Sequence, residues 1–155
     1  MFAVELATLT VELVSKSSSG ERGDLGSYWP SISRDGRYVA FESVAPNLIG
    51  APARDFPSSG VNPFLASDVF LRDRVRNTTT RVSRVPAGEQ AGSGSGRAVV
   101  SSDGSTVAFV STRTDLAGEA GFQARADYIW SRESGELTRI PNPPAPADSD
   151  GYLFV

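Results

Sequence analysis

The sequence predicts an all-β protein built from repeated units of short antiparallel strands. Three observations support this fold class: apolar and polar residues alternate over short runs, Asp-Gly dipeptides separate some of these runs, and one eleven-residue pattern occurs twice. Internal repeats are informative because each copy usually corresponds to one structural unit.

The repeated pattern is Ser-x-Asp-Gly-x-x-Val-Ala-Phe-x-Ser, found at residues 33–43 and 68 residues later at 101–111. Its defining residues are Asp35, Gly36 and Phe41 in the first copy and Asp103, Gly104 and Phe109 in the second. Asp-Gly favours the positive φ angles of a tight hairpin turn. The consecutive apolar residues after each turn, 38–41 and 107–110, favour strands that neighbouring sheets cover on both faces.

Two further strands complete each unit. Residues 68–71 correspond to 127–130 at an offset of 59, with Asp68 aligned to Asp127, and residues 80–83 correspond to 138–141 at an offset of 58. Because these offsets are smaller than 68, the first unit contains extra residues, which we assign to a loop at 45–67 rich in proline, serine and glycine.

The predicted organisation is two whole units flanked by partial ones. Residues 16–83 and 84–141 form the whole units, and 142–155 form a linker and the first strand of a further unit. Residues 1–15 read as a hairpin with a turn at Ala7-Thr8, equivalent to the last two strands of a preceding unit.

The first fourteen residues do not read as a signal peptide, because they lack a basic region and carry Glu5 and Glu12. No run of eighteen apolar residues predicts a membrane span.

These repeats resemble the β-propeller repeats of the TolB-like family, also called WD-like repeats. Residues 30–41 and 68–70 match the family motif, whereas the second copy has Ala98 or Val99 in place of the proline. The resemblance implies propeller blades of four antiparallel strands and a periplasmic or extracellular location. Closed propellers have four to eight blades, so we expect an incomplete ring within this chain, completed by oligomerisation or by a longer parent chain.

Composition excludes several functions. The chain has no histidine and no cysteine, which rules out a Ser-His-Asp triad, a histidine general base and a thiolate metal site within it. A net charge of −3 argues against nucleic-acid binding. Asp115, Glu119 and Asp127 could supply an acid pair, but their spacing fixes no catalytic separation, and we expect Asp127 to position its strand as Asp68 does.

Calcium is a possible ligand of the inserted loop, whose Asn47, Asp55, Asn62 and Asp68 carry oxygen ligands. No Asp-x-Asp-x-Asp-Gly run is present, and three prolines divide the loop, so its carboxylates need not converge on one ion. We therefore expect that the chain binds no cofactor.

Two groups of residues are candidates for binding. Arg72, Arg74 and Arg76 alternate, which predicts one face of a strand that could bind an acidic partner or could equally be a solvated edge. Trp29 and Phe64 could offer aromatic surface, although Trp29 could instead pack between units, and Trp130 is expected in the core.

The leading hypothesis is therefore a non-catalytic module that binds protein partners, or associates with itself through edge strands. The alternative is the propeller part of a larger hydrolase or lyase, where it gates or orients substrate for chemistry encoded elsewhere.

Overall fold

A computed structural model describes residues 1–50, 67–84, 94–113, 116 and 125–141. Three antiparallel sheets account for every strand in these ranges, and the only helix there is the short 3-10 helix η1 (Pro46–Ile49). The all-β class is thus confirmed. The described residues form no closed ring, and the predicted strand at 142–155 lies outside them.

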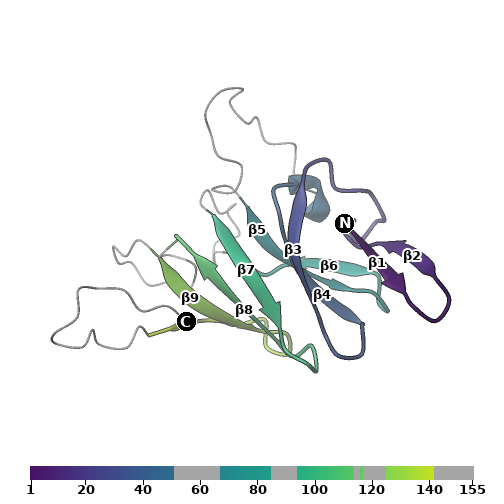
Figure 1. Cartoon of the computed structure of the whole chain (residues 1–155). Coiled ribbons are helices and arrows are strands. Elements are labelled where there is room, and N and C mark those ends of the chain that lie inside the picture. Colours follow the sequence, from purple (N-terminus) through teal and green to yellow (C-terminus); the bar gives the residue numbers. More distant parts are fainter. Residues whose placement is uncertain (51–66, 85–93, 114–115, 117–124, 142–155) are drawn as a thin grey trace, which may run out of the picture.

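The three sheets follow the chain in order (Figure 1). The first is a two-stranded hairpin of β1 (Phe2–Glu5) and β2 (Thr10–Leu13). The second contains β3 (Ser27–Ile32), β4 (Tyr38–Ser43), β5 (Asp68–Asp73) and β6 (Thr78–Arg81). The third contains β7 (Ser95–Val100), β8 (Thr106–Ser111), β9 (Ala126–Ser131) and β10 (Leu137–Ile140).

Each four-stranded sheet is a simple meander, in which strands that are consecutive in the chain pair with each other. Two hydrophobic clusters fill the spaces between neighbouring sheets. One joins the β3–β6 sheet to the hairpin and includes Val39, Phe41 and Phe70. The other joins the β3–β6 sheet to the β7–β10 sheet and includes Val107 and Tyr128.

The two four-stranded sheets share a stacked aromatic pair at equivalent positions. Phe41 stacks on Phe70 with ring centroids 5.7 Å apart, and Phe109 stacks on Tyr128 at 5.6 Å. Strand pairing therefore superimposes Phe70 on Tyr128 at an offset of 58, the offset also found for β6 and β10.

This register corrects one alignment made from the sequence. Ser43 pairs with Asp68 and Ser111 pairs with Ala126, so Asp68 is equivalent to Ala126 and not to Asp127. Because a shift of one residue moves a side chain to the other face of a sheet, Asp68 is buried and Asp127 is exposed. Asp127 therefore does not repeat the role of Asp68.

The Ser-x-Asp-Gly segments form two matching turns. Gly36 and Gly104 both have a φ of 71°, as the Asp-Gly pattern predicts. Asp103 accepts hydrogen bonds from the Ser101 hydroxyl (2.6 Å) and the Ser105 backbone N–H (3.0 Å), and the bond from Ser101 is the main cause that lowers the pKa of Asp103 to about 2. Asp35 accepts the equivalent bonds, so the serine and the aspartate of the motif stabilise the turn.

The prediction of strands covered on both faces is confirmed for one unit and wrong for the other. All six residues of β4 are buried between the hairpin and the β7–β10 sheet. In β8 burial alternates, and Ala108 is exposed, because no described residue covers the outer face of the β7–β10 sheet.

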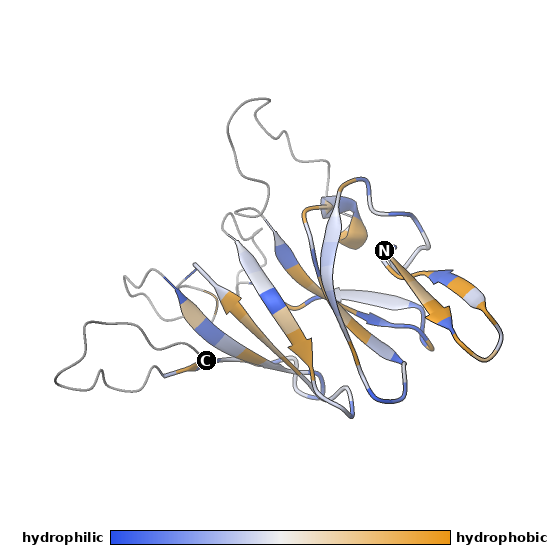
Figure 2. Ribbon diagram, in the orientation of Figure 1, coloured by the Kyte–Doolittle hydropathy of each residue, from blue (hydrophilic) through white to orange (hydrophobic). Residues whose placement is uncertain are grey.

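The N-terminal hairpin is also confirmed, with a turn over residues 6–9 rather than at Ala7-Thr8 alone. Met1 and Ala3 pack against the β3–β6 sheet, whereas Phe2, Val4 and Val11 on its other face are 62%, 52% and 60% exposed. Figure 2 shows this hairpin as largely hydrophobic although it lies at the edge of the molecule.

Candidate functional site

A cavity of about 750 Å³ opens between the first strands of the two sheets, β3 and β7. Its charged and aromatic lining consists of Trp29, Glu42, Arg97 and Arg125. Small polar side chains, among them Ser67, and apolar ones, among them Val110, complete the wall. Both sheets contribute, so the cavity exists only because they pack side by side.

Matching irregularities in β3 and β7 shape this cavity. Trp29 and Arg97 have positive φ angles of 50° and 54°, and the strand register shifts at both positions. Non-glycine residues in this backbone region are uncommon and often mark binding sites. The two bulges thus place Trp29 and Arg97 at equivalent positions of the two sheets, 68 residues apart, beside the cavity.

Glu42 is the buried acid of the cavity, with 6% of its surface exposed. Its carboxylate accepts a hydrogen bond from the backbone N–H of Arg97, and Gly96 leaves the space for it, since a Cβ there would lie 2.7 Å from the carboxylate. Burial raises the pKa of Glu42, opposed by the hydrogen bond from Arg97 and by the charge of Arg97.

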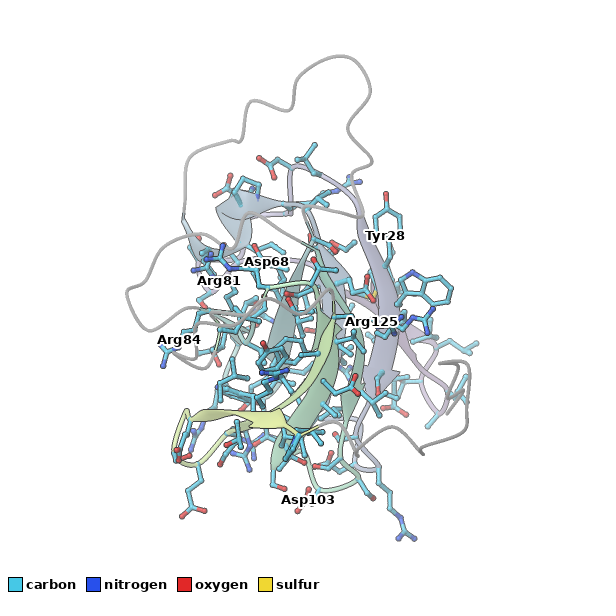
Figure 3. All side chains as sticks on the ribbon, turned by 90° about the vertical axis from the view of Figure 1, so that its left-hand side faces the viewer. Tyr28, Asp68, Arg81, Arg84, Asp103 and Arg125 are labelled. Carbon is cyan, nitrogen blue, oxygen red and sulfur yellow. The ribbon has the colours of Figure 1, made fainter. Side chains whose placement is uncertain are left out.

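Arg125 stands where the polypeptide enters β9. It lines the cavity and is exposed to solvent. Figure 3 shows Arg125 and Tyr28 on one flank of the molecule, opposite Asp68, Arg81 and Arg84. Within the described ranges, the guanidinium of Arg125 has no hydrogen bond or ion pair.

The predicted arginine face is wrong. Strand β5 ends at Asp73, so Arg74 and Arg76 lie in the following turn, while Arg72 is completely buried. Arg74 forms an ion pair with Glu12 at 2.8 Å. The alternation did not show where the strand ends, nor that the Arg72 side chain is enclosed by the segment after the hairpin.

The aromatic candidates separate in the structure. Trp29 is 68% exposed, so it does not pack between the sheets, and Trp130 is buried as expected. Phe64 lies outside the described residues.

Two of the four calcium candidates have other partners. Asn47 accepts a hydrogen bond from the backbone of Asp24 and donates one to Arg22, which ties η1 to the preceding loop. Asp68 accepts a hydrogen bond from the Ser83 hydroxyl at 2.9 Å and lies 4.0 Å from Arg81. Asp55 and Asn62, like the acid candidates Asp115 and Glu119, lie outside the described residues, and the described part contains no group of three acidic side chains that could hold a metal.

Glu42, Arg97 and Arg125 were not identified from the sequence. One signal was available for Arg97, since it occupies the same repeat position as Trp29, 68 residues later. Glu42 and Arg125 carry no such signal, because their proximity depends on how the sheets pack.

Among known proteins, the chain has a distant likeness to a solved structure. No family model matches the chain, and no curated protein matches it. Among solved structures the chain is similar to TolB from Acinetobacter baumannii, at 15% sequence identity and a TM-score of 0.32 over 89% of this chain and 36% of that one. The chain therefore spans about a third of that protein, and a TM-score this low does not establish a shared fold. In the described residues no helix is long and apolar enough to span a membrane.

Proposed function

We propose that this chain is a non-catalytic assembly module of the β-propeller type, which binds a second copy of itself through its uncovered sheet faces. The supporting observation is that the β3–β6 sheet packs one face on the preceding unit and the other face on the next. Val39 and Phe41 contact the hairpin side, and their equivalents Val107 and Phe109 contact the β3–β6 sheet.

The outer face of the β7–β10 sheet has the residues needed for another such contact. Ala40, Leu71 and Val82 form the core between the two sheets. Their equivalents on the outer face are Ala108, Ile129 and Ile140, all of them exposed. Exposed apolar side chains at these positions favour packing of a further sheet, since burial of apolar surface stabilises by about 25 cal/mol per Å².

The other end of the stack offers a complementary surface. In the hairpin, β1 and β2 correspond to β5 and β6. The outer edge of β1, which pairs with no other described strand, therefore lies where an equivalent of β4 would pair. Phe2 occupies the position of Phe70, which in the whole unit stacks on Phe41. No strand in the described part of the chain covers Phe2, which is 62% exposed.

We expect a second copy to fit these surfaces because the two ends are different and complementary. Among the described residues, one end presents an uncovered sheet face, and the other presents an uncovered hairpin with a free strand edge. Contacts between unlike ends build rings when the rotation closes. Such a ring would also remove the free strand edges that favour aggregation.

Light scattering of residues 1–155 over a range of concentrations tests this proposal. We expect an oligomer of defined mass. Ile129→Asp should reduce the mass toward that of the monomer, since it places a charge on the outer face. Val75→Asp is the matched control, because Val75 is 73% exposed in the turn after β5 and is not one of the residues that form either surface. A monomer at every concentration, or equal masses for the three proteins, would contradict self-assembly.

A further inference from the structure

We propose that the cavity between β3 and β7 binds a ligand that carries a single carboxylate next to an apolar planar group. This binding site goes beyond the assembly function, since each chain forms it alone. Its volume of about 750 Å³ lies within the range of about 300–1,000 Å³ that is common for ligand cavities.

The arginines provide the anion-binding part. Arg97 in β7 and Arg125, the residue just before β9, both line the cavity and are exposed to solvent. Guanidinium groups bind carboxylates through two parallel hydrogen bonds. Arg125 makes no such contact with any residue in the described ranges, so its donors are available to a ligand.

The buried Glu42 limits the negative charge that the cavity accepts. When it is ionised, its charge offsets one of the two guanidinium groups and leaves one positive charge in excess. A monoanion matches that excess, whereas a dianionic phosphate adds repulsion against Glu42. The cavity therefore favours a carboxylate over a phosphate.

Trp29 provides the apolar part. Its bulged backbone holds the side chain at the rim of the cavity, where 68% of it is exposed. Aromatic rings bury large areas and stack well on flat apolar groups. An exposed tryptophan beside two arginines thus favours a planar group attached to the acid.

Calorimetric titration with 3-phenylpropionate tests the proposal, and two probes vary its charge. We expect saturable binding of 3-phenylpropionate, at least about tenfold tighter than that of the neutral 3-phenylpropanamide and tighter than that of phenyl phosphate. Equal binding of the amide, or stronger binding of the phosphate, would overturn the proposed charge selection. N-acetyl-Phe-Glu-amide presents the same chemistry within a peptide, and comparison of its affinity with that of 3-phenylpropionate identifies the source of the natural carboxylate.

Arginine variants localise the binding. Arg125→Gln and Arg97→Gln should each weaken 3-phenylpropionate binding about tenfold. Arg76→Gln is the matched control, since Arg76 is an exposed arginine in the turn after β5. Trp29→Ala should also weaken binding and should remove any change in tryptophan fluorescence, because Trp130 is buried. Unchanged affinity in Arg125→Gln, with its circular dichroism intact, would place the ligand elsewhere and reject the site.

Discussion

Arg72 and Trp130 occupy equivalent buried positions in the two sheets, although one side chain is charged and the other apolar. The structure accommodates the charge with oxygen acceptors. The Arg72 guanidinium donates hydrogen bonds to the carbonyl groups of Asn77 (3.1 Å) and Ser17 (3.3 Å) and to the Thr79 hydroxyl (3.1 Å). Burial lowers the pKa of Arg72, opposed by the nearby carboxylates of Glu12 and Asp73. Arg72 therefore joins the segment after the hairpin to the second sheet.

Removal of this side chain should be costly. We expect Arg72→Ala to lower the free energy of unfolding by about 3–5 kcal/mol, because it leaves a cavity and removes a hydrogen-bond donor to the buried Ser17 carbonyl and Thr79 hydroxyl. Arg76→Ala is the control and should change that free energy by less than about 0.5 kcal/mol. Urea denaturation followed by circular dichroism measures both. Similar losses for the two variants would contradict a structural role specific to Arg72.

At the scale of the element, the two Asp-Gly turns have the same backbone but different surroundings. Both glycines have a φ of 71°. A Cβ on Gly36 would lie 3.6 Å from the Arg74 guanidinium, whereas one on Gly104 would lie 2.0 Å from the Tyr38 ring. Tyr38 is in turn flanked by the guanidinium groups of Arg37 and Arg132, at 4.8 and 4.5 Å from its ring. The second turn is thus part of the contact between the sheets.

Alanine substitutions separate the cost of backbone strain at these glycines from the cost of the close contact with Tyr38. Gly36→Ala should cost about 1–2 kcal/mol of unfolding free energy, the usual cost of positive φ for a residue with a Cβ. Gly104→Ala should cost about 1–3 kcal/mol more, because Tyr38 and its arginine partners must move. Thermal denaturation of both variants tests this difference. Equal costs would show that backbone strain alone explains both.

At the scale of the whole molecule, burial differs from sheet to sheet. The β3–β6 sheet lies between two hydrophobic clusters, whereas the β7–β10 sheet and the hairpin each have a face that no described residue covers. Local opening requires less free energy where fewer apolar contacts must break.

Hydrogen exchange should be slowest in the sheet that is covered on both faces. In Ile129→Asp, used to keep the chain monomeric, we expect amides of β4 and β5 to exchange most slowly, those of β8 and β9 faster, and those of β1 and β2 fastest. Mass spectrometry of peptic fragments measures this order. Uniform protection in all three sheets would show that the stack opens as one cooperative unit.

The sequence by itself determined the all-β class, the N-terminal hairpin and the repeated turns, because strand alternation and Asp-Gly chemistry act between residues close in the chain. It did not determine that β5 ends at Asp73, which wrongly placed Arg74 and Arg76 on the strand, nor that Arg72 is buried. It also did not determine the pairing that separates Asp68 from Asp127. Only the tertiary structure placed Glu42, Arg97 and Arg125 around one cavity. Their proximity depends on packing between sheets, and no local pattern of residues encodes that distance.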